Sequence, residues 1–356
     1  MPSLQSVRQA KHNSRIRSSV TLTHASRRVS PYSLKPSTYR SFFNMSSTPL
    51  LSGSNLPAPI IMQDHPVFLR ASHSAWRWID QKALVILRGA VLAYLAAAVS
   101  MTGHYKMTEE TGKSGLSNLF DFSMISSAMV FVYHLITFSW TYTHLYHPEP
   151  AEVEGRVERF IVKAMSLPQN MGSQRKQFYF NLFYSATTVF SFMNSTIYWF
   201  ITRQHDAGAA ANFVDSAVNI TSMASAMNMP DAPFSDLLGE GWFKAFIMIH
   251  LHAANSLLMS VEMLCFNSIK RPLSVGSHML GLMALSGLYL AWAAIGKSVT
   301  GEAPFFWMDE AQVGSKEAVS LYSIGFVLLA PMMYTLMQGF IGIRESLVRP
   351  RHSSSS

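Results

Sequence analysis

One stripe of a long apolar stretch carries polar residues that can do acid–base chemistry. The stretch from 245 to 266 is long enough to cross a bilayer as a helix. At about 100° per residue, the stripe is formed by Met248, His252, Asn255, Met259 and Glu262. An ionisable residue at membrane depth costs about 2.5 kcal/mol or more, so it usually faces the bundle interior and has a use. Hydrogen bonding between packed helices is the competing explanation, but three such groups on one face favour a site.

The base and the nucleophile of a hydrolase could come from this stripe and from the start of the segment 119–142. His252 lies about one third of the way along its helix, and Asp121 and Ser123 are expected at a comparable depth. A hydroxyl or carboxylate beside an imidazole can form an acyl-enzyme while the imidazole accepts the proton. We therefore predict His252 as the general base, with Ser123 or Asp121 as the nucleophile.

The other residues of the stripe are assigned to substrate binding. Glu262 lies about 10 Å along the helix from Asn255, which is too far for it to orient His252 directly. We expect Asn255, Met259 and Glu262 to line a pocket for an apolar substrate that enters sideways from the lipid. Neither a metal site nor a bound cofactor is predicted.

The composition is that of a membrane protein. The chain has 356 residues, of which 49% are hydrophobic and 13% charged, whereas average soluble chains carry about 25% charged residues. The net charge of +8 arises from residues 1–40, which contain eight Lys or Arg and no Asp or Glu. Because the rest is nearly neutral, we expect no nucleic-acid partner. The single cysteine, Cys265, excludes an internal disulfide.

Both ends of the chain are predicted to be disordered. Residues 1–63 contain no Asp or Glu, and they are rich in Ser, Arg and Pro without an apolar period. The same composition is typical of an organelle transit peptide, and Met45 could begin a shorter protein. Residues 347–356 form a second polar tail, which leaves 64–346 as one membrane domain.

Six apolar segments predict an all-α, multi-pass domain of six transmembrane helices. The segments are 84–102, 119–142, 179–201, 245–266, 278–295 and 319–343. Basic residues concentrate in both flanks and after the second and fourth segments, so both termini are expected in the cytoplasm. Arg88, near the start of the first segment, is expected to snorkel. The expected location is an endomembrane, such as the endoplasmic reticulum, or the plasma membrane.

Residues around the fourth and fifth segments carry a family resemblance. His252 is followed ten positions later by Glu262, with Asn255 between them, and the fifth segment leads to Thr300-Gly301 and Pro304-Phe305. In this pattern the chain resembles the androgen-induced family of six-helix membrane hydrolases, which cleave fatty acid esters of hydroxy fatty acids. The resemblance implies an intramembrane lipid ester hydrolase that works among membrane lipids on a long-chain fatty acyl ester.

The family pairs the His of its fourth helix with a Thr nucleophile on its second helix, and this sequence departs from that pattern. A gap-free register places Asp121 at the Thr position, whereas a shift of two residues places Ser123 there. Ser123 would preserve acyl transfer. Asp121 implies either a carboxylate nucleophile or a protein that binds lipid without hydrolysing it.

Two other functions stay open at this point. A non-catalytic lipid-binding protein or transporter is consistent with the missing Thr and with the absence of strong charge pairs from the sequence pattern. A haem-binding electron carrier would use His134, His252 and His278, since imidazole is a common haem ligand. The segment 179–201 contains no His, so it cannot complete a two-haem arrangement of paired helices.

Overall fold

Helices make up the regular secondary structure of the described part of the chain. The computed structural model describes residues 65–108, 115–147, 155–168, 170–205, 242–272 and 274–348, all within the unit Pro49–Ser356. No strand occurs among these residues, which confirms the predicted all-α class. The predicted tail 1–63 and residues 349–356 of the second tail lie outside the described residues.

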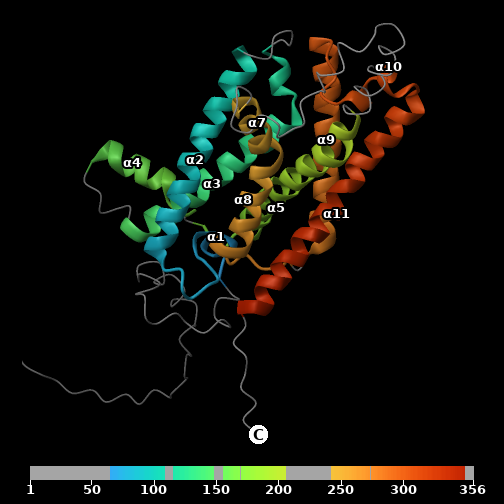
Figure 1. Cartoon of the computed structure of the whole chain (residues 1–356). Coiled ribbons are helices and arrows are strands. Elements are labelled where there is room, and N and C mark those ends of the chain that lie inside the picture. The colour runs from blue at the N-terminus through green and yellow to red at the C-terminus, as the bar shows by residue number, and fades with distance from the viewer. Residues whose placement is uncertain are drawn as a thin grey trace, which may run out of the picture. The chain divides into compact units, whose positions relative to one another are not determined.

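Long helices alternate with short ones along the chain (Figure 1). The first half contains α1 (Val67–Ser72), α2 (Gln81–Thr108), η2 (Ser117–Leu119), α3 (Phe122–Tyr146), α4 (Arg156–Met165), α5 (Gln174–Ile197) and η4 (Tyr198–Thr202). The second half contains α7 (Trp242–Ile249), η5 (His250–Ala254), α8 (Asn255–Val261), η6 (Glu262–Phe266), α9 (Val275–Thr300), η7 (Phe306–Met308), α10 (Glu310–Val313) and α11 (Lys316–Val348). Three of the short elements, η4, η5 and η6, are π-helical turns.

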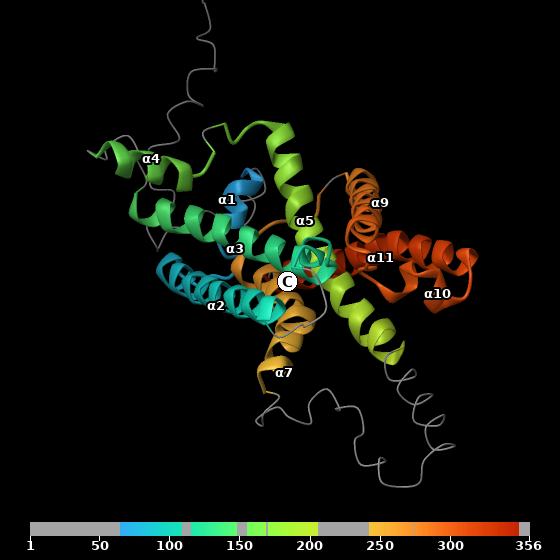
Figure 2. The ribbon, with the colours of Figure 1, turned by 90° about the horizontal axis from the view of Figure 1, so that it is seen from above.

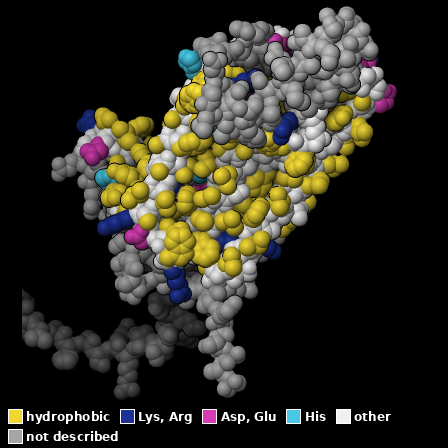
Figure 3. Space-filling model, viewed as in Figure 1, with side chains coloured by type: hydrophobic (Ala, Val, Ile, Leu, Met, Phe, Trp, Pro, Cys, Tyr) yellow, Lys and Arg dark blue, Asp and Glu magenta, His cyan; other side chains and the backbone are white. Residues whose placement is uncertain are grey.

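Five of the described helices are long and apolar enough to cross a membrane. They are Gln81–Met107, Phe122–Tyr146, Trp242–Phe266, Val275–Thr300 and Lys316–Val348. Figure 3 shows hydrophobic side chains over much of the helical surface on the side in view. The described helices therefore fit a multi-pass membrane protein. The sixth predicted segment, 179–201, lies in α5 and η4, which are not among the five.

α5 is more polar than the other long helices because protein surrounds most of its surface. It packs against α3, α8, α9, α11 and α1, and the views in Figures 1 and 2 agree that it lies among these helices. Its buried polar side chains are Asn181, Ser185, Thr187, Thr188, Ser191 and Asn194. The Thr187 and Thr188 hydroxyls donate to the carbonyls of Phe183 and Tyr184 one turn back. Small polar side chains of this kind also permit close contact between helices in a membrane.

The fourth predicted segment is one helix interrupted by two π turns. α7, η5, α8 and η6 follow each other without a gap from Trp242 to Phe266. Side chains of α5 and η4 bond the carbonyls of η5: Asn194 Nδ2 donates to Leu251 O at 2.7 Å, and Ser195 Oγ and Trp199 Nε1 donate to His252 O at 2.6 and 3.1 Å. A π turn winds the chain less per residue than an α-helix. The predicted stripe was placed with the α-helical angle, so its positions after His250 do not all face the same side of the observed helix.

Arg88 does not snorkel; it is fully buried and bonds inside the bundle. Its guanidinium forms an ion pair with Glu262, with 2.6 Å between Nη2 and Oε1. It also donates to the backbone carbonyls of Ala71, Thr137 and Phe266 at 2.7, 3.2 and 3.1 Å. The expectation that Arg88 snorkels was wrong. Its polar partners lie on elements far away in the sequence, and the residues of one helix do not indicate them.

Side chains from α2, from α11 and from the connection between α1 and α2 bond the end of the helix Trp242–Phe266. A helix normally ends with carbonyls that have no partner within it, and each carbonyl of η6 finds one here. Asn267 N–H bonds Glu262 O, and side chains bond the next four carbonyls: Arg344 bonds Met263, Trp76 bonds Leu264, Ser74 bonds Cys265 and Arg88 bonds Phe266. Irregular backbone at membrane depth is tolerated when protein satisfies it in this way. We call the residues Ser74, Trp76, Arg88 and Arg344 the carbonyl clamp.

Candidate functional site

Asp121 and Ser123 bond to each other at the start of α3. Asp121 is the N-cap: its Oδ1 accepts from Ser123 N–H at 2.8 Å and from Ser123 Oγ at 2.6 Å. Its Oδ2 pairs with Lys106 Nζ at 2.7 Å. Burial opposes ionisation of this carboxyl, but Lys106 and the hydrogen bonds from Ser123 outweigh burial and lower the pKa of Asp121. Helix capping and an ion pair therefore account for Asp121 without chemistry.

His252 stacks on a tyrosine and makes no hydrogen bond to either predicted nucleophile among the described residues. Its ring stacks on Tyr198, with the ring centroids 3.8 Å apart and the planes 7° apart. Its Nδ1 is buried and has no hydrogen-bond partner in the part of the chain that the structure describes. Asp121 lies close enough for an electrostatic interaction with the ring. No hydrogen bond joins His252 to Asp121 or Ser123 among the described residues, so the predicted catalytic pairing lacks direct contact.

A different histidine contacts a serine of α3. His250 is fully buried; its Nε2 lies 3.4 Å from Ser127 Oγ, and its Nδ1 lies 3.3 Å from Tyr94 Oη. Ser127 lies one helical turn after Ser123 and is buried as well. Sequence reasoning missed this pair because it placed His250 on the far side of an ideal α-helix. The spacing of four residues between the two serines was the signal available for Ser127.

Two aromatic side chains lie against His250. Tyr94, on α2, is 37% exposed, with its ring edge against the His250 ring at 5.7 Å between centroids. Phe246, one turn before His250, stacks on the other side of the imidazole with the planes 11° apart. The imidazole thus contacts two aromatic rings, of which that of Tyr94 is partly exposed.

The three predicted pocket residues have different surroundings. Met259 is buried in the main hydrophobic core. Asn255 is buried, and neither atom of its amide has a hydrogen-bond partner among the described residues. Glu262 is paired with Arg88 and accepts from Tyr133 Oη at 3.2 Å. This buried ion pair corrects the expectation that strong charge pairs are absent.

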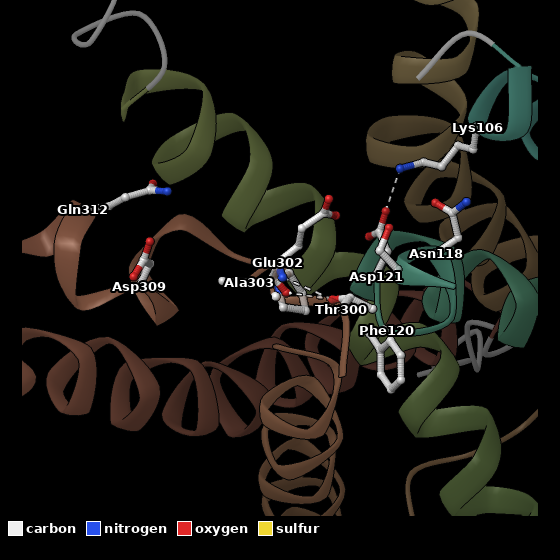
Figure 4. A pocket seen from close by; sticks show the side chains of 12 residues that line it. Lys106, Asn118, Phe120, Asp121, Thr300, Glu302, Ala303, Asp309 and Gln312 are labelled. Atoms are coloured by element: carbon white, nitrogen blue, oxygen red, sulfur yellow. Dashed lines mark hydrogen bonds and ion pairs between the residues drawn. The ribbon is translucent and has the colours of Figure 1, made fainter. Parts of the chain in front are cut away.

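A polar pocket opens beside Asp121 at the end of the bundle (Figure 4). It has a volume of about 420 Å³. Lys106 and Asp121 face each other on one side of it, and Asp309 and Gln312 lie on the other. Thr300, Gly301 and Pro304, which belong to the family-like pattern, also line it. The pocket suits a polar group, and it is separate from the ring-lined site of His250.

The three histidines of the haem alternative have separate surroundings. His134 is buried beside Tyr133, and neither of its ring nitrogens has a hydrogen-bond partner among the described residues. His278 contacts Asn181 Nδ2 at 3.2 Å and Ser274 O at 2.9 Å, while His252 stacks on Tyr198. Within the described ranges, no group of three or more His, Cys, Asp or Glu could hold a metal ion. No contact favours the haem alternative.

Comparisons with protein-family models, curated proteins and solved structures found no match for this chain. The family resemblance read from the sequence therefore stays an expectation, and the functional argument rests on the geometry above.

Proposed function

We propose that this chain is an intramembrane lipid ester hydrolase in which Ser127 is the nucleophile and His250 is the general base. The contact between Ser127 Oγ and His250 Nε2, 3.4 Å long in a buried site, is the observation that carries the proposal. Contacts of this kind are often long before substrate binds and shorten in the reactive complex. The reaction class is that expected from the sequence, with a different serine and a different histidine.

Each group of the site has a role in acyl transfer. In this mechanism His250 carries its proton on Nδ1, which lies 3.3 Å from Tyr94 Oη, and its Nε2 accepts the Ser127 proton. Ser127 Oγ then forms a bond to the ester carbonyl carbon, and the alcohol leaves with the proton held on His250. Water attacks the acyl-enzyme with His250 again accepting a proton, which releases the fatty acid and restores Ser127.

Asn255 is the candidate donor to the negative oxygen of the tetrahedral intermediate. It follows His250 by five residues, which is one turn of the π-helix η5. Its amide is buried and unpartnered among the described residues, so Nδ2–H is available to a ligand. A donor that is already in place, in a site without water, stabilises developing charge strongly.

The substrate class follows from the surroundings of the site. The outer face of α2 around Tyr94 is apolar and exposed, with Ile86 and Leu87 two turns before it. A long-chain fatty acyl ester can therefore approach from the bilayer with its chain against α2. Soluble short esters have no comparable route, because His250 and Ser127 are buried from water.

We also propose six spans with both termini in the cytoplasm, in an endomembrane or the plasma membrane. α5 is the sixth span: it has 24 residues and continues into η4. Its polar side chains face protein and not lipid, so low hydropathy does not prevent it from crossing. Basic residues gather at the end of the bundle near α1, α4 and the residues 270–271, as the positive-inside rule requires.

Alanine substitutions test the hydrolase directly. Ser127→Ala and His250→Ala should each lower the rate of long-chain ester hydrolysis by roughly 10²–10⁴-fold, and Ser127→Ala should abolish labelling by a fluorophosphonate. Ser126→Ala is the matched control, because Ser126 is a buried neighbour whose hydroxyl has no partner among the described residues.

The same assay separates the two pairings. Loss of activity in Ser123→Ala and His252→Ala, with normal Ser127→Ala and His250→Ala, would establish the pairing predicted from the sequence. A wild-type protein inactive on all long-chain esters tried would reject the hydrolase.

A non-catalytic lipid-binding protein or transporter is the second candidate, and the polar pocket beside Asp121 favours it. A pocket of about 420 Å³ is large enough for a small polar solute or a lipid headgroup. This candidate predicts retention of a lipid by the purified protein in native mass spectrometry, without esterase activity. Asp309→Ala and Gln312→Ala should then weaken retention, because both side chains line the pocket.

A further inference from the structure

α4 is a short helix beside the end of α3, and its apolar side chains are exposed. Val157, Phe160 and Ile161 are 74%, 72% and 50% exposed, whereas Val162 is 7% exposed and contacts the bundle. The chain is tied to α3 at the end of the helix, where Thr143 Oγ1 donates to Met165 O at 3.2 Å. Figure 3 shows hydrophobic and charged side chains next to each other at the place of α4.

Three separate faces run along α4. At about 100° per residue, Val157, Phe160, Ile161 and Ala164 form one apolar arc. Arg156, Arg159 and Lys163 form a cationic arc whose centre is roughly 120° away from that of the apolar arc. Val162 lies between the two arcs, on the side toward Glu158, and faces the bundle. A helix with this arrangement can touch the bundle with one side while its apolar side points into a bilayer.

We infer that α4 lies in the membrane interface as an amphipathic helix that binds anionic lipid. Its apolar arc enters the boundary between headgroups and acyl chains, and its cationic arc faces the headgroups. Arg156 and Lys163 are both exposed, so their charges are accessible to lipid. This surface is independent of the Ser127 site, which lies near the opposite end of α3.

Charge and position identify the occupant as membrane lipid. Between α3 and α5 the sequence first carries three acidic residues, Glu149, Glu152 and Glu154. The residues from 156 to 176 then carry five basic side chains (Arg156, Arg159, Lys163, Arg175 and Lys176) and one acidic side chain, Glu158. Such a stretch next to the end of a membrane span attracts a negatively charged leaflet. α3 ends at Tyr146 and α5 begins at Gln174, so both spans reach the interface where α4 lies. Exposed Val157, Phe160 and Ile161 fit acyl chains, and the cations beside them fit phosphate or carboxylate.

Nitroxide labels placed along α4 of the full chain test this orientation. In a Cys265→Ser background, single cysteines at positions 157, 160 and 161 sample the apolar arc, and positions 156 and 163 sample the cationic arc. The labelled protein is placed in nanodiscs of phosphatidylcholine, or of phosphatidylcholine and phosphatidylserine in equal amounts. Accessibility to molecular oxygen, which concentrates in lipid, is compared with accessibility to a water-soluble nickel chelate.

The expected ratio of oxygen to nickel accessibility follows the helical period of about 3.6 residues, with maxima at 157, 160 and 161. Phosphatidylserine should raise these maxima, and Arg156→Gln with Lys163→Gln should remove that increase. Nickel access at 157, 160 and 161 equal to that at 163 would place the apolar arc in water and overturn the inference. Exclusion of both reagents would show that protein covers it, which also overturns the inference. If phosphatidylserine leaves the ratio of oxygen to nickel accessibility unchanged, α4 does not bind anionic lipid and that part of the inference is overturned.

Discussion

The helix Trp242–Phe266 contains two π turns, η5 in its middle and η6 at its end, which differ in how their side chains are bonded. At η6, each backbone carbonyl has a partner, four of them in the carbonyl clamp, and Glu262 is paired with Arg88. At η5, the contacts of His250 are long, and the Asn255 amide and His252 Nδ1 have no partner among the described residues. Buried polar groups are expensive when unpaired. The comparison indicates that η6 holds the fold together, whereas η5 keeps polar groups available for a ligand.

Replacing Arg88, one residue of the carbonyl clamp, should cause the largest loss of stability. Arg88→Met leaves the buried Glu262 carboxylate and the Phe266 carbonyl without their partner, and removal of one member of a buried ion pair costs about 3–5 kcal/mol. A thermal melt in nanodiscs measures the change. The double variant Arg88→Met with Glu262→Met removes both charges and should recover part of the loss. An unchanged melting temperature in Arg88→Met would mean that the ion pair does not stabilise this end.

Asn255→Ala should separate chemistry from stability at η5. Loss of one donor to an oxyanion lowers kcat by about 10²–10³-fold, while the melting temperature should change little because the amide has no described partner to lose. Asn181→Ala is the matched control, since Asn181 is a buried Asn bonded to His278. It should lower stability and leave kcat unchanged. If Asn255→Ala and Asn181→Ala lower stability equally and neither changes kcat, Asn255 has a packing role.

His73, next to Ser74 of the carbonyl clamp, should make the stability of the fold fall in acid. Burial, then the nearby His144, lowers the pKa of His73 to about 4 from an ordinary value of 6.5. The unfolded chain therefore binds a proton in this window and the folded chain does not, so stability falls as pH falls from about 6.5 to about 4. The slope from one such group is at most about 1.4 kcal/mol per pH unit. Unfolding followed at several pH values should show a smaller slope in His73→Gln, and an unchanged slope would exclude this group.

The smallest effect is expected at the cap of α3. Asp121→Ala removes an N-cap, which costs about 0.5–2 kcal/mol, together with the ion pair to Lys106. Asp80→Ala is the control, because Asp80 Oδ1 bonds Ala83 N–H at 2.8 Å at the start of α2. Ester hydrolysis should persist in Asp121→Ala if Ser127 is the nucleophile. Complete loss of hydrolysis with normal folding would restore Asp121 as the nucleophile.

The sequence predicted the helices better than it predicted the site. Apolar runs of about 20 residues are a local signal, and five of the six predicted segments appear as apolar helices long enough to span. The sixth, 179–201, lies in α5 and η4, which are helical but are not among those five, because buried polar side chains lower the hydropathy there. Met259, expected in the pocket, is a core residue because apolar residues in a stripe serve packing as readily as binding.

The site depended on features that the sequence does not display. At about 100° per residue, His250 lies about 160° around the helix from His252. The site was predicted on the His252 side, whereas the contact with Ser127 is made by His250. The Arg88–Glu262 pair joins residues 174 positions apart, which no local pattern indicates. α4 was read only as a basic loop, because ten residues are too few for a convincing helical period.

The carbonyl clamp can be completed only late in the synthesis of the chain. Arg344 bonds the carbonyls of Met263, Asn267 and Ile269, yet it follows Met263 in the chain by 81 residues. The Arg344 donors are therefore absent until the last span has been synthesised. A chain truncated before Arg344 would lack its hydrogen bonds to the carbonyls of Met263, Asn267 and Ile269.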